Sequence, residues 1–376
     1  MEKLRVLQVI GAMNRGGAET VVMNLLRSID RERFQFDFLV HEQGRCDYDD
    51  EIESLGCTIY RIPRFKVANA GPYRAICRRF FAEHPEYHVV HGHIGSCASI
   101  YLGEANRAGC ATIAHSHNVN STRLLHRTLY GYLVRDLPQI ADAFLGCSLQ
   151  AGIDRFGIGV AATERFNVMR NGIDLSSYEN DAATHARAKE ALGYADVPLV
   201  GNVGRLVTQK NQGFLLDVFA GILREVPEAR LLVVGRGEKE GELKEKAESL
   251  GIAASVDFLG VRDDVPEILK ALDVFVFPSL REGLGMSLVE AQAASVPCLA
   301  TDTIARDAFL TDYAKPLPLA AGADEWARQA VALLQDPPAR KDARQAIQAQ
   351  GYDIESVARW MEGYYRQLAA TYCTHK

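Results

Sequence analysis

The chain alternates between two kinds of hydrophobic pattern along most of its length. Short runs rich in Val, Ile, Leu and Phe end in glycine, histidine or a small polar residue, and longer stretches with helical spacing lie between them. This alternation is typical of βαβ units, in which helices cover both faces of a parallel sheet. We therefore expect an α/β protein.

The strand candidates fall into two groups separated by a polar interval. The first group lies at 4–11, 34–40, 57–62, 87–93, 111–117, 142–148 and 165–172. The second group lies at 198–205, 230–237, 255–260, 273–279 and 297–302. The interval 174–198 is polar and charged, and we interpret it as a linker region plus one helix. Two doubly wound domains, at about 1–175 and 176–350, are the simplest architecture.

The end of the chain predicts a single amphipathic helix over 352–372. Its apolar positions are Ile354, Val357, Trp360, Met361 and Tyr364, which recur at helical spacing. A chain of 376 residues is too long for one ordinary core, which agrees with more than one domain.

Composition narrows the class of protein. A hydrophobic content of 48% and a charged content of 24% are ordinary for a globular protein. The eight cysteines form no C-x-x-C pair and no zinc spacing, so we expect reduced thiols and a cytoplasmic protein. No stretch reaches 18 apolar residues, so neither a signal peptide nor a spanning helix is expected. The net charge of −6 argues against nucleic-acid binding.

Positive charge is concentrated in one part of the first half. Between Ser54 and Arg135 there are ten Lys/Arg against three Asp/Glu. Such an excess can be a solvated face, or it can face an anionic membrane or a phosphorylated acceptor. Six arginines, at 74, 78, 79, 123, 127 and 135, are interleaved with Phe80, Phe81, Leu124, Leu125, Tyr130 and Tyr132. This pattern suits peripheral contact with an anionic membrane, or the buried stripes of ordinary amphipathic helices.

Two loops of the second half contain residues suited to phosphate. Arg205 and Lys210 share the loop after the strand at 198–205, where a guanidinium and an ammonium can bind phosphate oxygens or simply be solvated. After the strand at 230–237, "GRGEKEG" contains Gly235, Gly237 and Gly241. It is a loose match to a dinucleotide fingerprint, and its glycines can equally serve a turn at the strand end.

The stretch 279–293, "SLREGLGMSLVEAQA", contains two glutamates on either side of a glycine-rich join. If a helix begins near Met286 or Ser287, Glu282 lies in the loop above its N-terminus and Glu290 lies within it. Gly283 and Gly285 would then precede free helix amides, which form an anion site without a metal. The two carboxylates could flank one elongated anionic ligand.

The first half has its own candidates at the ends of strands. Gly16 and Gly17 lie in the first strand-to-helix loop, where bare backbone can approach a ligand closely. The pairs His91/His93 and His115/His117 each close a strand, and H-x-H on a strand points both imidazoles to one face. A metal site would need further ligands, and no acidic or cysteine set lies nearby. We therefore favour polar groups that line a sugar site over a metal, and a strand-end histidine without function remains open.

Taken in order, these motifs resemble the retaining glycosyltransferases of family 4, in particular the bacterial exopolysaccharide and capsule branch. The motifs that carry the resemblance are "GGAE", "HSHN", "VMRNGID", "VGRLVTQKN", "LLVVGRGE", "VDFLGVRDDVPEILKALDVFVFPSLREGLGMSLVEAQA" and "PCLATD", and they cover nearly the full chain. The resemblance implies a GT-B architecture: two Rossmann-like domains facing a central cleft, with the helix at 351–376 crossing back to the first domain.

The resemblance also implies roles for individual residues. Arg205 and Lys210 match the clamp on the donor diphosphate. Glu282 matches the glutamate that meets the transferred sugar, and Glu290 matches the one that meets the nucleotide ribose. The remaining matches are His115, beside the reacting carbon; Gly16 and Gly17, near the donor phosphates and acceptor; and the amides around Gly285, Met286 and Ser287, which would hold phosphate. Gly235 and Gly283 are further candidates for binding the donor.

Two positions depart from the pattern of the family. Ser295 stands where members often have glycine in an "A-x-G-x-P" turn, and Gly285 stands where many have proline. Both bear on the geometry of the donor loop.

The sequence therefore predicts a metal-independent, retaining glycosyltransferase without a cofactor. We expect its partners to be a nucleotide-diphosphate sugar, such as a UDP-sugar, and a polysaccharide or lipid-linked glycan acceptor. One alternative is a UDP-sugar 2-epimerase on the same fold, which needs acids and bases around C2 of the sugar. Another is a dinucleotide-binding regulatory protein built on "GRGEKEG".

Overall fold

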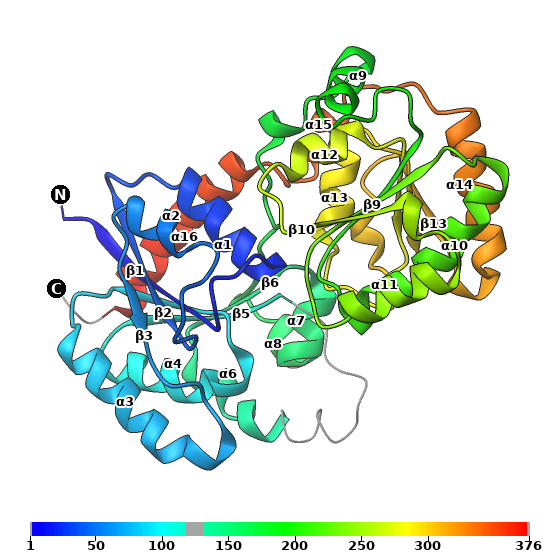
Figure 1. Ribbon diagram of the computed structural model, residues 1–376. Coiled ribbons are helices and arrows are strands. Elements are labelled where there is room, and N and C mark those ends of the chain that lie inside the picture. The colour runs from blue at the N-terminus through cyan, green and yellow to red at the C-terminus, as the bar shows by residue number, and fades with distance from the viewer. Residues whose placement is uncertain (1, 118–130, 374–376) are drawn as a thin grey trace. The chain divides into compact units, whose positions relative to one another are not determined.

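The structure, a computed structural model, describes residues 2–117 and 131–373, and the chain divides into two compact units (Figure 1). Met1–Gly172 and Ile354–Lys376 form the first unit, and Ile173–Asp353 forms the second. The chain therefore leaves the first unit at Gly172 and returns to it for its last helix. Each unit has its own parallel sheet and its own hydrophobic core on each face of that sheet.

The sheet of the first unit has seven described strands in the order β3-β2-β1-β4-β5-β6-β7. They are β1 (Leu4–Ile10), β2 (Phe34–Val40), β3 (Ile59–Arg61), β4 (Val89–Gly92), β5 (Ala111–Ser116), β6 (Ala143–Gly146) and β7 (Phe166–Val168). Every strand predicted for this half is present. The strand order changes direction between β1 and β4, and ligands of doubly wound sheets bind beyond the carboxyl ends of the strands at such a switch point.

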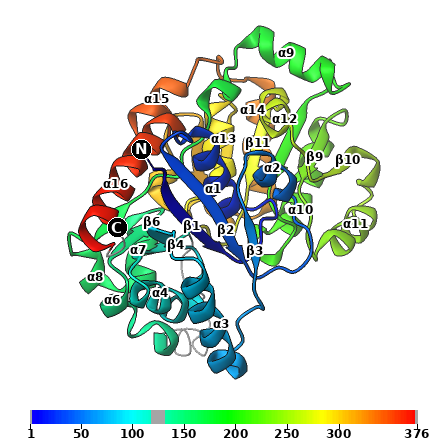
Figure 2. The ribbon, with the colours of Figure 1, turned by 90° about the vertical axis from the view of Figure 1, so that its left-hand side faces the viewer.

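Helices cover both faces of the first sheet. They are α1 (Gly17–Ser28), α2 (Asp49–Ser54), α3 (Ala70–Glu83), α4 (Ala98–Arg107), α6 (Leu137–Ile140), α7 (Leu149–Phe156), α8 (Ile158–Ala161) and α16 (Ile354–Tyr372). One core packs α1, α2 and α16 on the sheet, and the other packs α3 and α4 on the opposite face. Figure 2 shows α16 beside this sheet, where it contacts α1, β4 and β5.

The second unit has a six-stranded parallel sheet in the order β10-β9-β8-β11-β12-β13. Its strands are β8 (Leu199–Val203), β9 (Arg230–Val234), β10 (Val256–Gly260), β11 (Val274–Phe277), β12 (Cys298–Thr301) and β13 (Ala314–Leu317). Its helices are α9 (Ala182–Ala191), α10 (Gln212–Glu225), α11 (Glu240–Ser249), α12 (Val265–Ala271), α13 (Met286–Ala293), α14 (Ala323–Gln335) and α15 (Arg344–Ala349). The switch point lies between β8 and β11.

The sequence analysis missed β13. This strand lies at the edge of the sheet and pairs with β12 alone, so much of it faces solvent. It contains Lys315 and Pro316, both exposed, instead of an apolar run. Proline is tolerated on an edge strand because the missing N–H is not needed by a neighbour.

The interval 174–198 was wrongly interpreted as a linker region, although the one predicted α-helix, α9, is present. The interval belongs to the second unit, and its contacts are structural. Asn180 is buried and donates to the carbonyl oxygens of Ala294, at 2.6 Å, and Lys270, at 3.3 Å. Lys189 is paired with Asp273 at 2.8 Å. Two of its polar residues, Asn180 and Lys189, therefore fasten the interval to the second unit, while most of the others are exposed.

The predicted apolar face of the C-terminal helix needs one correction. Ile354, Val357 and Met361 are buried as expected, but Trp360 is 39% exposed and stacks on Tyr364. Tyr365 is fully buried in its place. The periodic pattern predicted the helix correctly but misplaced part of its buried face.

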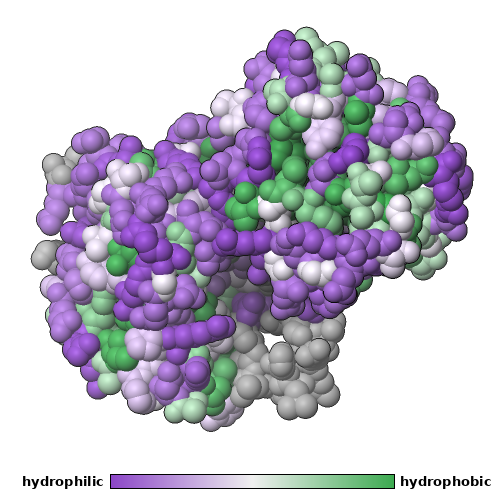
Figure 3. Space-filling view, viewed as in Figure 1, coloured by the Kyte–Doolittle hydropathy of each residue, from purple (hydrophilic) through white to green (hydrophobic). Residues whose placement is uncertain are grey.

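The visible surface is mainly polar, and the thiols are free. Figure 3 shows hydrophilic residues over most of the visible face, with hydrophobic residues in separate patches. None of the described helices has both the length and the apolar composition that a membrane-spanning helix needs. All eight cysteines are free thiols.

Candidate active site

The loops after β8 and β11 are joined by hydrogen bonds at the switch point of the second sheet. The side-chain amide of Gln209 donates to the carbonyl of Arg281 at 2.9 Å, and the backbone N–H of Leu280 donates to the carbonyl of Gln209 at 2.9 Å. The amide of Asn211 donates to the carbonyl of Pro278 at 3.1 Å. The loop with Arg205 and Lys210 and the loop with Glu282 therefore form one surface.

Lys210 is held in place on three sides. Its Nζ lies 2.8 Å from Oε1 of Glu282 and 4.9 Å from the centre of the Phe277 ring. The side chains of Lys210 and Glu282 are only 15% and 8% exposed. A Cβ at Gly204 would lie 3.2 Å from Cε of Lys210, so glycine there leaves room for the lysine stem. The result is a buried ammonium at a fixed position.

Lys210 and Glu282 form a close ion pair, and Oε1 of Glu282 is buried. The oxygens of an ionised carboxylate together offer about four lone pairs, and one lysine does not use them all. The pair thus leaves acceptor capacity that a hydroxyl of a ligand can use.

Arg205 lies on the same loop as Lys210 but differs from it in exposure. Its side chain is exposed, and within the described residues it makes no hydrogen bond or ion pair. Only its backbone carbonyl is engaged, by the Gln212 amide at 3.0 Å. Arg205 therefore shares the loop of Lys210, but its side chain is not held in place as the lysine is.

Helix α13 begins at Met286, which confirms the predicted helix start. Gly285 precedes it with φ +83°, and its carbonyl accepts from the N–H of Leu288 at 2.9 Å. The first amides of a helix, here those of Met286 and Ser287, have no partner within it and bear partial positive charge. Gly283 and Ser287 are buried beside this terminus. The terminus offers backbone donors to an anion.

The φ of Gly285 also explains a departure from the family pattern. Proline fixes φ near −65°, so the backbone seen here at φ +83° excludes it. A Cβ at this position would also lie 3.0 Å from Cε1 of Phe277. The loop before α13 thus depends on glycine where many family members have proline.

Ser295, the second departure, lies beyond the other end of α13. It is buried with φ +54°, a left-handed conformation that glycine adopts more easily. Its Oγ donates to the carbonyl of Lys341 at 2.7 Å, and its own carbonyl accepts from Arg340 at 3.3 Å. These bonds offset the backbone strain. The substitution therefore affects the C-terminal end of α13 instead of the N-terminal end, where the phosphate site is predicted.

Glu290 lies within α13, on the same unit as Lys210. Burial raises the pKa of its carboxyl to about 7, and the nearby Lys210 charge partly opposes this rise. The pKa of the buried Tyr178 is raised by burial and by the Glu290 charge. The Glu290 carboxyl therefore takes up a proton more readily than an exposed glutamate.

Two of the three glycines of "GRGEKEG", Gly235 and Gly237, have a structural explanation, whereas a Cβ at Gly241 would meet nothing within 4 Å. Gly235 has φ +130°, and a Cβ there would lie 2.1 Å from the carbonyl oxygen of Gly204. A Cβ at Gly237 would lie 2.2 Å from the carbonyl oxygen of Leu206. The loops after β8 and β9 pack backbone against backbone, and only glycine fits. This explains the motif without a dinucleotide, and a phosphate contact of Gly235 stays a prediction.

Gly16 and Gly17 lie at the start of α1, at the carboxyl end of β1 in the first unit. Gly16 caps the helix in an extended conformation, and Gly17 is its first residue. A Cβ at Gly17 would meet nothing within 4 Å, and one at Gly16 would meet the flexible end of Glu19. Packing within the chain therefore does not demand glycine at position 17.

The two histidine pairs of the first unit form one cluster. His91 Nε2 lies 3.0 Å from His115 Nδ1, and His93 Nδ1 lies 2.7 Å from His117 Nε2. Burial lowers the pKa of all four imidazoles, to about 3 for His91 and about 4 for His117. The four rings are therefore neutral at physiological pH.

Distance alone would allow a metal in this cluster. Ligand nitrogens of His91, His93 and His115 lie within 4.8 Å of one another, the one such group among the described residues. Hydrogen bonds between the rings already use several of these nitrogens. His115 is 5% exposed, and its Nε2 has no partner in the described part of the chain.

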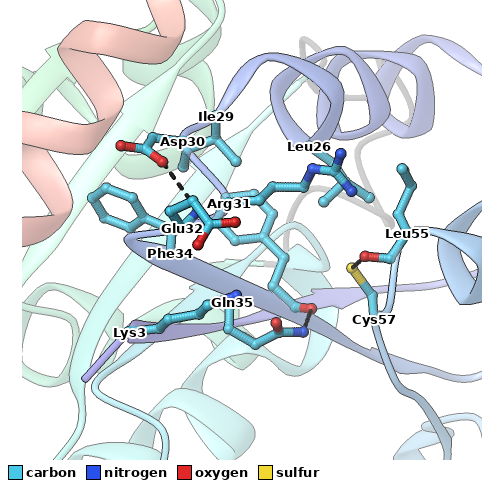
Figure 4. Close-up of a pocket in the computed structure, with 11 residues that line it drawn as sticks. Lys3, Leu26, Ile29, Asp30, Arg31, Glu32, Phe34, Gln35, Leu55 and Cys57 are labelled. Atoms are coloured by element: carbon cyan, nitrogen blue, oxygen red, sulfur yellow. Dashed lines mark hydrogen bonds between the residues drawn. The ribbon is translucent and has the colours of Figure 1, made fainter. Parts of the chain in front are cut away.

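A cavity of about 400 Å³ lies elsewhere in the first unit (Figure 4). Its walls come from the end of α1 and the beginning of β2, including Ile29, Asp30, Phe34 and Gln35. These residues lie at the amino ends of the strands, opposite the edge with the histidines. Ligands of such sheets bind at the carboxyl ends, so this cavity is separate from the candidate site.

Three contributors were not predicted from the sequence. Phe277 lies under the Lys210 ammonium, and Gln8 and Tyr365 hydrogen-bond to the histidine cluster. Gln8 had a signal, because it is a polar residue inside the apolar run 4–11. Phe277 and Tyr365 had none, since an aromatic residue in a strand or helix usually belongs to the core.

Comparison with known proteins assigns the family. The model of Glycosyltransferase Family 4 matches residues 15–177, and that of Glycosyl transferases group 1 matches 186–350. The putative glycosyltransferase EpsF of Bacillus subtilis (strain 168) is 34% identical over 361 residues, which is 93% of each chain. The chain belongs to glycosyltransferase family 4.

Two further comparisons show similarity over part of the chain and similarity of fold. An Escherichia coli enzyme, UDP-Gal:alpha-D-GlcNAc-diphosphoundecaprenol alpha-1,3-galactosyltransferase, is 32% identical over 142 residues, 37% of each chain. The crystal structure of Anabaena Alr3699/HepE in complex with UDP and glucose has a TM-score of 0.80. It is 19% identical and covers 97% of this chain and 100% of its own. The predicted pair of Rossmann-like domains of the GT-B class is confirmed.

Proposed function

We propose that this family 4 glycosyltransferase is a retaining, metal-independent enzyme that transfers a sugar from a UDP-sugar. The acceptor is a polysaccharide or a lipid-linked oligosaccharide in the synthesis of a cell-surface glycan. The observation that carries the proposal is the grouping of Lys210, Glu282 and the N-terminus of α13 at the switch point between β8 and β11.

We assign the donor from the charged side chains and the helix amides that line this site. Lys210, Arg205 and the amides of Met286 and Ser287 suit a diphosphate, because they combine two cations with helix-end donors. Glu282, on the loop before the helix, then accepts from sugar hydroxyls, and Glu290 accepts from the ribose. The names of the HepE structure and of the Escherichia coli enzyme both contain UDP, which supports the choice of base.

The proposed transfer needs no protein carboxylate as base. The bond between the anomeric carbon and the β-phosphate oxygen breaks, and the acceptor oxygen bonds to the same face of that carbon. The acceptor proton moves to the departing phosphate oxygen, and the configuration is retained. Arg205 and Lys210 stabilise the charge that develops on the phosphate.

The proposal of metal independence rests on the same cations. Enzymes that use Mg²⁺ on a diphosphate hold it through carboxylates. Glu282, the acidic residue nearest to Lys210 in this structure, is paired with that lysine instead. We therefore expect activity to survive EDTA. Complete loss with EDTA and recovery with Mn²⁺ would contradict this part of the proposal.

A lipid-linked acceptor would bring the first unit to an anionic membrane surface, peripherally and on the cytoplasmic face. The structure corrects the aromatic part of this hypothesis, because Phe80 and Phe81 are buried in the core and cannot enter a lipid layer. Arg74, Arg78 and Arg79 remain exposed on α3. The residues at 123, 124, 125, 127 and 130 lie outside the described residues.

The proposed membrane contact also rests on Tyr132 and Arg135. Tyr132 is 64% exposed, and the Arg135 guanidinium lies 4.7 Å from its ring centre. Tyr132→Ala with Arg135→Glu should reduce co-sedimentation with anionic vesicles, and Arg224→Glu, an exposed change in the second unit, should not. Equal recovery of wild-type protein with anionic and neutral vesicles would end the membrane proposal.

The test of the proposed function is a transfer assay with a set of UDP-, GDP- and ADP-sugars and glycan or lipid-diphosphate acceptors. We expect stabilisation and transfer with a UDP-sugar, and a product whose anomeric proton shows the donor's configuration by NMR. Incubation with UDP-sugar without acceptor tests the epimerase alternative. Formation of a C2 epimer there would replace the transferase proposal, and inversion of configuration would contradict the mechanism.

A further inference from the structure

Gln8 is a fully buried polar residue in the middle of β1, and its two amide atoms contact two different side chains, those of His93 and Tyr365. Its Oε1 lies 2.8 Å from Nε2 of His93, and its Nε2 donates to the Tyr365 hydroxyl at 3.3 Å. Gln8 lies opposite His91 in the register of β1 and β4. One amide is thus the common origin of two hydrogen-bonded chains.

The first chain runs from Gln8 through His93 to His117. An amide oxygen only accepts, so Nε2 of His93 must donate. His93 is neutral, so its Nδ1 has no proton and accepts from Nε2 of His117 at 2.7 Å. His117 is neutral as well, so its Nδ1 has a free lone pair. This chain ends in an acceptor.

The second chain runs from Gln8 through Tyr365 and His91 to His115. The amide N–H donates to the Tyr365 oxygen, so the hydroxyl proton is free to go to Nδ1 of His91 at 2.7 Å. Nε2 of His91 then donates to Nδ1 of His115 at 3.0 Å. Nε2 of His115 bears the remaining proton. This chain ends in a donor.

One chain ends in a donor and the other in an acceptor because the Gln8 side-chain amide has one oxygen and one nitrogen. Turning the Gln8 side chain over would exchange its oxygen and nitrogen, reverse both chains, and leave one end a donor and the other an acceptor. The orientation seen here gives all four histidines the Nε2–H tautomer. Both end atoms, Nε2 of His115 and Nδ1 of His117, are buried without a hydrogen-bond partner within the described residues.

We propose that Gln8 and Tyr365 are positioning residues that fix opposite hydrogen-bonding character at His115 and His117, which together present one donor and one acceptor to a hydroxyl group. A hydroxyl both accepts and donates, whereas an anion only accepts. That the hydroxyl belongs to a carbohydrate rests on the proposed function; the tautomers do not. The last helix of the chain takes part in the site through Tyr365.

The tautomers can be measured directly on the full chain with ¹⁵N-labelled histidine. Long-range proton–nitrogen NMR spectra at pH 7 should show His91, His93, His115 and His117 as Nε2–H tautomers. Tyr365→Phe removes only the second chain, so it should mix the tautomers of His91 and His115 and leave His93 and His117 unchanged. Mixed tautomers in the wild type, or no change in Tyr365→Phe, would overturn the proposal.

A matched control breaks a different buried Tyr–His bond in the same unit. The Tyr73 hydroxyl lies 2.8 Å from Nε2 of His41. Tyr73→Phe should change the His41 signals alone. Zinc added to chelator-treated protein should leave the four cluster signals in place; their joint displacement by one equivalent would mean that the cluster is a metal site and not a relay.

Kinetics separate this inference from the proposed function. Tyr365→Phe should lower kcat/KM about tenfold, the effect of about one hydrogen bond, and Gln8→Met should lower it further while Tyr73→Phe leaves it unchanged. If NMR shows the predicted tautomers but the protein has no transferase activity, only the claim that the hydroxyl belongs to a carbohydrate is refuted. Transferase activity with unaltered kinetics in Tyr365→Phe would remove the positioning role. If Gln8→Met fails to fold, Tyr365→Phe alone decides.

Discussion

At the switch point of the second sheet, a buried ammonium, two carboxylates and the positive end of a helix lie together. At the switch point of the first sheet, four neutral imidazoles, an amide and a phenol lie in hydrogen-bonded chains. Both sheets are parallel and doubly wound, so the scaffold is the same. The side chains at the strand ends make one site charged and the other neutral, and we propose that the first binds an anion and the second binds hydroxyls.

The largest effect should come from the cations of the second unit. Arg205→Ala and Lys210→Ala should each cost about 2–4 kcal/mol of transition-state stabilisation, the range for a charged donor in a closed site. The double mutant should cost less than the sum, because both act on one group. Lys246→Ala, which breaks a more exposed ion pair with Asp217, is the control. Near-normal turnover in either single mutant would remove its role.

Gly285→Ala tests whether the helix end must keep its present geometry. The left-handed φ and the close Phe277 ring should cost about 1–2 kcal/mol in the free energy of unfolding and reduce affinity for UDP. Gly251→Ala is matched for backbone strain, with φ +70° and open space around it. It should lose similar stability in a thermal melt but no affinity. Equal loss of affinity in both would mean that the effect is general destabilisation.

Calorimetry and turnover should distinguish the roles of Glu282 and Glu290. Glu282→Gln should impair turnover with UDP-sugar and leave the affinity for UDP nearly intact, whereas Glu290→Gln should weaken both by about tenfold, the value of one charge-assisted hydrogen bond. The reverse pattern would exchange the sugar and ribose assignments.

The smallest effect concerns pH. The pKa of Glu290 is raised to about 7 in the folded state, so the folded protein holds one more proton than the unfolded chain between about pH 4.5 and 7. This contribution to stability is present at low pH and lost as pH rises through 7. From pH 6 to 8 wild type should therefore lose about 1 kcal/mol relative to Glu290→Gln. Denaturant melts that run parallel over this range would contradict the raised pKa.

The sequence predicted the start of α13 and brought Lys210 and Glu282 into one candidate site because these signals are local. Lys210 follows a strand, and Glu282 and Gly285 precede a helix whose start is visible as a change of pattern. The histidine relay was not predicted, because the contact between His91 and His115 depends on the register of two strands 24 residues apart in the chain. Tyr365 comes from a helix 274 positions away from His91.

The wrong predictions also arise from contacts between residues that are distant in sequence. Phe80 and Phe81 are adjacent to arginines in sequence, yet the helix turns both rings into the core. Edge strand β13 lacked an apolar run because solvent, not another strand, lies beyond it. In each case the burial of a side chain depended on tertiary neighbours that a short window does not contain.

The central claim is that Arg205 and Lys210 of the second unit bind the diphosphate of a nucleotide. Calorimetry with uridine and with UDP, on wild type and on the Arg205→Ala/Lys210→Ala double mutant, tests it most directly. The account predicts that wild type binds UDP far more tightly than uridine and that the double mutant loses most of this difference while its affinity for uridine stays the same. Equal affinity of wild type for uridine and UDP, or an unchanged preference for UDP in the mutant, would contradict it.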